Sequence, residues 1–241
     1  MSEPVYSRVI LKLSGDVLRG GEKCGIDFGF VNRIADEIGE AHRHGIQIGI
    51  VVGGGNLFRG TDVVKLGYER ITADNMGMLS TVINALAIQN ALESIKVPTR
   101  VMSAINIAEL VEPFIRLRAI RHLEKGRVVI FAGGTGNPYF TTDTAAALRA
   151  SQVEAEVILK GTKVDGVFDR DPKAEADAVK FDQLDYMDIV SRELKVMDLT
   201  AITFSRDFRI PIHVFNILEE GNFWRTVCGE HLGTVVREVH P

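Results

Sequence analysis

The chain is poor in cysteine and carries little excess charge. Its two cysteines, Cys24 and Cys228, lie far apart and in no metal-ligand spacing, which argues against a disulfide scaffold or a zinc cluster and favours a reducing compartment. The formal net charge of −4 argues against a generic polyanion-binding surface. We therefore expect no nucleic-acid partner, and we expect any bound phosphate to be held by local groups.

Long apolar runs are also missing, so no membrane partner is expected. The first four residues include an acid and no apolar segment, unlike a secretory signal, and the expected location is the cytoplasm. What is present is an ordinary globular composition. The 241 residues are 46% hydrophobic and 25% charged, which is enough for a sizeable core.

Short apolar runs alternate with helical patterns along the chain. One helix is expected after Asp27, a preferred N-cap residue, with apolar residues spaced by three and four and an end at Gly45. Further helices are expected at about 72–92, before Gly126, at 144–149, at 196–206 and, as a short one, after 215. Strands are expected at 9–11, 46–52, 99–102, 128–131, 157–160, 212–215 and 234–236.

This alternation predicts an α/β fold, a three-layer α/β/α sandwich with a mostly parallel central sheet. We expect one domain over residues 1–241, with an acceptor half at about 1–150 and an ATP half at about 151–241. In such sheets ligands bind outside the carboxyl ends of the strands, and each loop discussed below follows a strand or opens a helix there.

The loop at residues 135–143 is the most informative segment. It follows an apolar strand, opens a helix, and combines threonine hydroxyls and an amide with the carboxylate of Asp143. A strand, a small-residue loop and a helix together point backbone N–H groups and the positive helix end at an anion.

A second loop, GGGNLFRG at residues 53–60, also follows a strand. Successive glycines allow a ligand to approach the backbone closely, and Arg59 can fork onto phosphate oxygens. The spacing fits neither a P-loop nor a Rossmann fingerprint. A tight glycine turn that serves packing remains an alternative.

Two single residues each allow a structural and a functional interpretation. Lys12, at the end of the first strand, is either a solvated lysine at a strand edge or a cation that neutralises a transferring phosphoryl group. Asp74, near the start of the long helix, either complements the helix dipole or binds a ligand.

The segment at residues 160–172 carries two lysines and three aspartates around an apolar Val167–Phe168 pair. Turn formation explains part of this composition. A nucleotide explains more of it, because it needs cations for phosphate, carboxylates for ribose or metal-bound water, and an apolar wall for the base.

In order along the chain, the motifs KLSG (from Lys12), GGGNLFRG, GTGNPYFTTD (from Gly134), LKGTKVDGVF (from Leu159) and ELKVMDL (from Glu193) resemble the bacterial uridylate kinases of the amino acid kinase superfamily. The resemblance covers essentially the whole chain. It implies phosphoryl transfer from ATP, with Mg²⁺, to UMP in pyrimidine nucleotide (CTP and UTP) biosynthesis. It also implies a homohexamer that UTP inhibits and that, in many members, GTP activates. From residues 135–142, which we call the acceptor loop, we expect CMP to be a much poorer acceptor than UMP.

The resemblance also assigns site residues, but no direct metal ligand. The candidate catalytic residues are Lys12, Arg59, Asp143 and Lys160. On chemical grounds we expect Asp143 to orient lysines such as Lys12, because a carboxylate cannot itself stabilise the developing phosphoryl charge. The implied ATP-binding residues are Lys12, Leu13, Ser14, Gly15, Gly55, Arg59, Thr162, Phe168 and Asp171. The implied UMP-binding residues are Gly54, Asp74, Thr135, Gly136, Asn137, Pro138, Tyr139, Phe140, Thr141 and Thr142. The implied allosteric residues are Gly20, Gly21, Glu22, Lys23, Cys24, Gly25, Arg100 and Arg127.

Two other functions stay open from the sequence: a non-catalytic nucleotide-binding or storage protein on the same fold, and a sibling kinase that acts on a small carboxylate such as an amino acid. For GTP we expect weak activation. Glu93 would repel phosphate near the implied site, and Arg116 stands where enteric members carry an aromatic residue.

Overall fold

The computed structural model describes residues 3–239 apart from 171, 173 and 176, and for 61–63 the backbone alone. Within the described residues a nine-stranded sheet has the order β4-β3-β5-β2-β1-β6-β10-β11-β9. Its strands are β1 (Arg8–Leu13), β2 (Gln47–Val52), β3 (Thr99–Ser103), β4 (Glu112–Pro113), β5 (Val128–Ala132), β6 (Val157–Thr162), β9 (Gln183–Leu184), β10 (Ile212–Asn216) and β11 (Thr234–Val236). Neighbouring strands are parallel except for β10 and β11.

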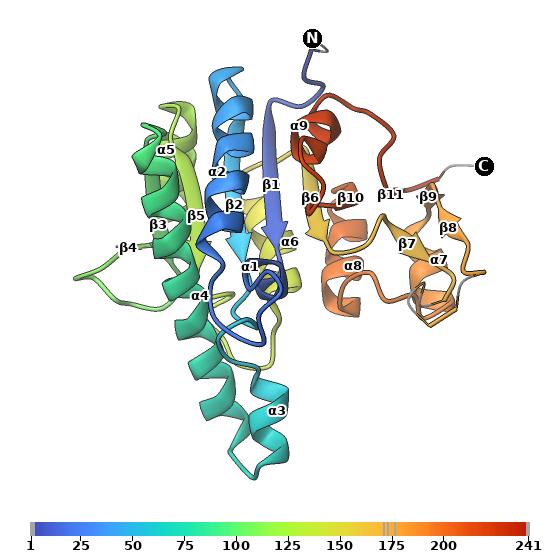
Figure 1. Ribbon diagram of the computed structural model, residues 1–241, viewed down its shortest axis with the longest axis horizontal. Helices are drawn as coiled ribbons and strands as arrows, with labels where there is room; N and C mark the ends of the chain where they lie inside the picture. The colour runs from blue at the N-terminus through green and yellow to red at the C-terminus, as the bar shows by residue number, and fades with distance from the viewer. Residues whose placement is uncertain (1–2, 171, 173, 176, 240–241) are drawn as a thin grey trace.

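Helices cover both faces of this sheet (Figure 1). The helices are α1 (Gly15–Leu18), α2 (Phe28–Arg43), α3 (Gly60–Lys65), α4 (Arg70–Ser94), α5 (Arg116–Glu124), α6 (Thr142–Gln152), α7 (Tyr186–Ser191), α8 (Leu199–Asp207) and α9 (Asn222–Val227). One core layer packs α2, α4 and α9 on the sheet, and a second packs α5, α6, α7 and α8 on its other face. The expected three-layer α/β/α sandwich is confirmed.

Local signals place most of these elements where we expected them. The Asp27 side chain caps α2 by accepting from the Phe30 N–H at 3.0 Å, and Gly45 follows the helix with a φ of +84°. The long helix α4 begins two residues earlier than expected and ends two residues later. We did not expect α1, α3, α7, β4 and β9 from the sequence, or a separate antiparallel pair formed by β7 (Val167–Phe168) and β8 (Lys180–Phe181).

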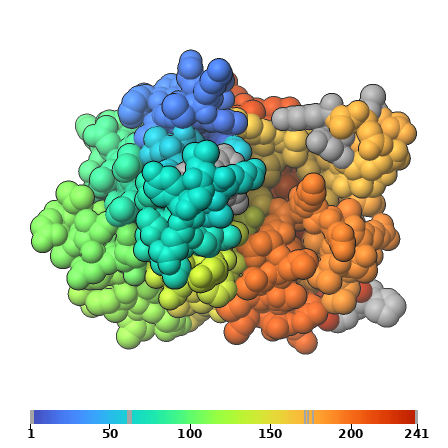
Figure 2. Space-filling model, turned by 90° about the horizontal axis from the view of Figure 1, so that it is seen from below, coloured from blue at the N-terminus to red at the C-terminus, as the bar shows by residue number. Residues whose placement is uncertain are grey.

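The carboxyl ends of β1, β2, β5 and β6 point toward one end of the molecule, where α3 and the start of α4 project beyond the sheet (Figure 1). Figure 2 looks onto this end: the teal α3–α4 projection lies to the left and centre, and the orange α7 and α8 lie to the right. In the part of the chain that is described, no helix is long and apolar enough to cross a membrane.

Candidate active site

Two lysines lie opposite each other at the centre of the sheet. Lys12 on β1 pairs in register with Lys160 on the neighbouring strand β6, and the two residues are 5% and 8% exposed. Like charges directly across two strands destabilise a sheet unless a counter-charge separates them. The reading of Lys12 as a solvated lysine at a strand edge is therefore wrong.

Asp143 supplies that counter-charge. Its Oδ1 lies 2.5 Å from the Lys12 Nζ, and its Oδ2 accepts from the Lys160 Nζ at 2.9 Å. Burial favours the neutral acid, but the charges of Lys12 and Lys160 outweigh it and lower the pKa of Asp143 to about 2. Burial and the charge of Lys12 lower the pKa of Lys160 to about 8 against the opposing pull of Asp143. The carboxylate thus keeps two buried ammonium groups side by side.

The N-terminus of α6 sets the position of Asp143. Thr141 is the N-cap, and its hydroxyl accepts from the Asp143 N–H at 3.0 Å while donating to Asp198. Thr144 donates to the same Asp198 carboxylate at 2.9 Å, and Asp198 also caps α8 through the Ala201 N–H. The acceptor loop, α6 and α8 are therefore joined at one carboxylate.

The glycines of the 53–55 loop serve two different purposes. A Cβ on Gly53 would lie 2.8 Å from the Gly15 nitrogen, and one on Gly54 would lie 2.7 Å from the Gly77 carbonyl oxygen of α4. For these two positions the packing explanation holds. A Cβ on Gly55 would meet only the Arg59 side chain, at 3.9 Å, so Gly55 faces open space.

A cavity of about 280 Å³ lies between this loop, α4 and the acceptor loop. Of the residues expected to hold the acceptor, it is lined by Gly54, Asp74, Thr135, Asn137, Phe140, Thr141 and Thr142. Gly136, Pro138 and Tyr139 belong to the same loop but do not line it. Gly55 and Arg59, expected on the ATP side, also line it. Sequence segments about 80 residues apart thus form one site.

Asp74 connects the long helix to the acceptor loop. It lies beyond the first turn of α4, so dipole complementation in that turn does not explain it. Its Oδ2 accepts from the Arg70 Nε at 2.8 Å and from the Tyr139 N–H at 2.8 Å. Tyr139 has a φ of +73°, unusual for a residue with a side chain, and this hydrogen bond helps to hold that conformation.

Arg59 forms an ion pair with a residue of α1. Its guanidinium pairs with Asp16 on α1, and its side chain is 44% exposed. This pairing is exposed and therefore weak, so Arg59 can exchange Asp16 for a phosphate.

The remaining residues expected to bind ATP lie along the same end of the sheet. The Leu13 side chain is fully buried in the core, so only the backbone of Leu13 is available to a nucleotide. Ser14 and Gly15 form the turn from β1 into α1. The Thr162 hydroxyl donates to the Val164 carbonyl at 2.7 Å, and Phe168 lies on β7. Asp171 lies outside the described residues.

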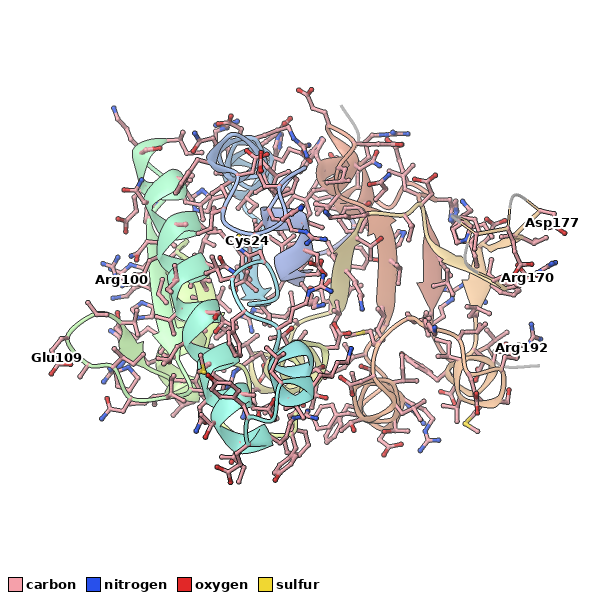
Figure 3. The ribbon with its side chains drawn as sticks, turned by 60° about the horizontal axis from the view of Figure 1, so that its bottom comes forward. Cys24, Arg100, Glu109, Arg170, Asp177 and Arg192 are labelled. Carbon is pink, nitrogen blue, oxygen red and sulfur yellow. The ribbon has the colours of Figure 1, made fainter. Side chains whose placement is uncertain are left out.

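The structure does not bring the expected allosteric residues together. Residues 20–25 form the turn between α1 and α2, where Figure 3 labels Cys24. Arg100 lies on β3, next to the edge strand β4, and Figure 3 labels it on the other side of α4 from Cys24. The Glu112 carboxylate lies near several of the basic groups at this edge. It is 3.6 Å from Arg100 and 3.2 Å from the ring of His122, and the His122 ring is hydrogen-bonded to Arg127. This edge is less positive than its arginines suggest.

Several residues of the site were not predicted. Arg70, Phe58, Met78 and Thr81 line the cavity, Asp16 holds Arg59, and Asp198 holds the start of α6. Asp198 had a signal, because an aspartate directly before Leu-Thr-Ala-Ile is an N-cap pattern. Among the described residues no group of three His, Cys, Asp or Glu side chains is arranged to hold a metal ion.

Comparisons with known proteins agree with this geometry. The model of the amino acid kinase family matches residues 7–216. Uridylate kinase of Xanthomonas oryzae pv. oryzae is 52% identical over 237 residues, 98% of this chain and 99% of the relative. UMP kinase from Bacillus anthracis superposes with a TM-score of 0.94 at 40% identity, covering 98% of this chain and 97% of its own. UMP kinase from Ureaplasma parvum gives 0.91 at 38% identity, covering 96% and 99%. The chain belongs to the amino acid kinase family.

Proposed function

We propose that the protein transfers the γ-phosphoryl group of ATP to UMP, giving ADP and UDP. The observation that carries the proposal is the cavity in which the acceptor-loop residues meet Gly55 and Arg59, at the strand ends that also carry Lys12 and Lys160. The relatives named uridylate kinase or UMP kinase support the choice of acceptor. The acceptor half at about 1–150 supplies the cavity, and the ATP half at about 151–241 supplies Lys160 and the Thr162–Phe168 loop.

The chemistry asks little of the protein beyond position and positive charge. The attacking oxygen of UMP is already an anion, so no general base is needed. Lys12 and Lys160 offset the negative charge that the two nucleotides bring together, and Arg59 adds a third cation at the rim. Asp143 does not itself stabilise the phosphoryl group. Its carboxylate keeps both lysines protonated and holds their ammonium groups in position.

Mg²⁺ would enter as the ATP complex. The described side chains offer no carboxylate cluster for it, and both oxygens of Asp143 are occupied by lysines. Its ligands would be phosphate oxygens, so we assign no step to a protein-bound metal.

We also propose that UTP inhibits by competing with UMP, since it presents the same uracil and ribose to the acceptor loop. Its additional phosphates would extend toward Arg59. Discrimination against cytosine would come from the Asn137 amide and the Thr135 hydroxyl. The bound base would cover these groups, and a donor or acceptor that it buries and leaves unpaired costs about 1–3 kcal/mol.

Self-association as a homohexamer is supported by the exposed face of α4. Met76, Leu79 and Ile83, spaced by three and four, are 40%, 50% and 53% exposed. An apolar helical stripe of this kind favours burial against another copy of the chain. GTP activation at the Arg100–Arg127 edge would be weak, because Glu112 already offsets this charge.

An acceptor screen tests the proposal. ADP release is followed with ATP and Mg²⁺ and with UMP, CMP, dUMP, glutamate or aspartate as acceptor. We expect a kcat/KM for UMP well above that for every other compound. Comparable values for UMP and CMP would refute the specificity, phosphorylation of an amino acid would favour the sibling kinase, and nucleotide binding without turnover would favour a storage protein. Titrating GTP and UTP in the same assay tests both effectors.

A further inference from the structure

Two asparagines form a buried pair behind the glycine loop. Asn56 is 2% exposed and Asn84, in the middle of α4, is 0% exposed. The Asn84 Nδ2 donates to the Asn56 Oδ1 at 2.7 Å, and the Asn56 Nδ2 donates to the Asn84 Oδ1 at 3.0 Å. Burying two primary amides is costly unless every polar atom is paired, so a purely structural position in this helix would favour an apolar side chain.

Each amide also holds one backbone carbonyl. The Asn84 Nδ2 donates to the Gly53 carbonyl at 2.7 Å, and the Asn56 Nδ2 donates to the Gly25 carbonyl at 2.8 Å. Since a backbone carbonyl only accepts, both side-chain nitrogens must face these oxygens, and the orientation of the pair is fixed.

The bond to Gly53 determines which way the next peptide N–H points. In a planar trans peptide the C=O and the following N–H lie on opposite sides. With the Gly53 carbonyl turned toward Asn84, the N–H of Gly54 is turned away from it. The Gly54 carbonyl accepts from the N–H groups of Leu57 and Phe58, both at 3.0 Å, which fixes the Gly55 N–H in the same manner.

These N–H groups are free to bind a ligand. Within the described residues, the backbone N–H groups of Gly54 and Gly55 donate to no protein acceptor, and both glycines line the cavity. Asn56 also packs closely against the turn from β1 into α1, since a Cβ on Gly15 would lie 2.8 Å from its Oδ1. Successive unused N–H groups beside cations form a site for a phosphate oxygen.

We infer that the Asn56–Asn84 pair positions the N–H groups of Gly54 and Gly55 against the phosphoryl group in transfer. The inference rests on the proposed function, because it deepens the role of the same site. Neither asparagine touches the nucleotides; they are positioning residues that act through Gly53 and Gly25. Asn84 controls the loop that lines the cavity, and Asn56 joins this loop to residues 20–25.

Asn84→Asp tests the hydrogen bond from Asn84 to the Gly53 carbonyl. The substitution is isosteric, keeps an acceptor for Asn56, and removes the donor to Gly53. We expect kcat to fall about 10²-fold, the size of effect expected from misplaced groups in a preorganised site. The KM values for ATP and UMP should change less than about threefold. Asn90→Asp, the same change at an exposed position of α4, is the matched control and should leave kcat unchanged.

Calorimetry separates positioning from loss of folded enzyme. Binding of ADP alone is compared with binding of ADP, UMP and aluminium fluoride, which together mimic the transferring group. In Asn84→Asp we expect weaker binding of the mimic, unchanged ADP affinity and unchanged stoichiometry. A lower stoichiometry that accounts for the lost turnover, or a raised KM with unchanged kcat, would overturn the inference.

Asn84→Ala covers the case in which Asn84→Asp does not fold. It removes the donor to Gly53 without adding a charge, so at a temperature where the variant is folded its kcat should also fall about 10²-fold, and a near-normal kcat counts against the inference. An unmodified protein that releases no ADP with UMP refutes the proposed function instead. Binding of ADP with aluminium fluoride then still tests whether the Asn56–Asn84 pair positions the N–H groups of Gly54 and Gly55.

Discussion

Replacing Asp143 by asparagine tests the charge arrangement at the centre of the sheet. The substitution keeps the shape of the side chain but leaves Lys12 and Lys160, opposite each other on β1 and β6, without a counter-charge. Removing one partner of a buried ion pair costs about 3–5 kcal/mol. Because 1.36 kcal/mol corresponds to one pKa unit, this is enough to lower the pKa of one lysine by about two units or more.

The pKa of Lys160 is already low enough in the unmodified protein for a further decrease to change activity near neutral pH. With Asp143 in place, the pKa of Lys160 is already lowered to about 8, mainly by burial. Without the carboxylate, one lysine should lose its proton near or below neutral pH. We therefore expect the basic limb of the kcat/KM profile for ATP, which reports the free enzyme, to move about two units toward lower pH. The shift in kcat should be smaller, because bound phosphates replace the missing negative charge.

The assay is ADP release between pH 5 and 10, with Asp207→Asn as control. Asp207 forms an exposed pair with Arg206, which contributes little to stability, so the control should match the unmodified protein in profile and melting temperature. Asp143→Asn should also melt at a lower temperature, by roughly 6–20 °C, because 1 kcal/mol shifts the melting temperature of a chain of this size by about 2–4 °C. An unchanged basic limb together with an unchanged melting temperature would refute the reasoning.

Three further predictions follow from the same contacts. In acid, the free energy of unfolding should fall by roughly 2 kcal/mol between about pH 4 and pH 2. The pKa of Asp143 is lowered from 3.8 to about 2 in the folded protein, so its stabilising effect is complete above the unfolded-state pKa and is lost as the pH falls through the folded-state pKa. Denaturant titrations of the protein and of Asp143→Asn would show whether the difference between their free energies of unfolding disappears in this range. Thr141→Val removes the N-cap acceptor of α6 and the bond to Asp198, so it should destabilise the fold by about 1 kcal/mol and raise KM for UMP more than it lowers kcat; a change in kcat alone would contradict the assignment of Thr141 to binding. Gly15→Ala places a Cβ 2.4 Å from the Gly55 nitrogen and should abolish turnover, whereas Gly21→Ala, with open space around the Cβ, should not; full activity of Gly15→Ala would show that the close approach is dispensable.

The sequence predicted the elements that carry strong local signals. Asp27 and Gly45 mark the two ends of α2, and the apolar runs of β1, β2, β5 and β6 are buried and parallel as expected. The two-residue strands β4, β7, β8 and β9 were missed, because so short a segment has no periodicity to detect and depends on its neighbour in the sheet.

Within the site, the sequence indicated residue types but not partners. The pairing of Lys12 with Lys160 depends on strand order and register, and neither can be read along the chain. Two interpretations of Asp74 were possible from the sequence, and its hydrogen bond to the Tyr139 N–H, 65 residues away, cannot be predicted from the local pattern. The pairing of Arg59 with Asp16 likewise depends on how α1 packs near the glycine loop.

The register between β1 and β6 has a consequence for how this sequence can change. Side chains alternate between the two faces of a strand, and Leu11 faces the apolar layer under α2 while Lys12 faces α6. Deleting or inserting a single residue in β1 ahead of Lys12 would turn the ammonium into that apolar layer and put a leucine beside Asp143. The lengths of these two strands are therefore as constrained as the identities of their lysines.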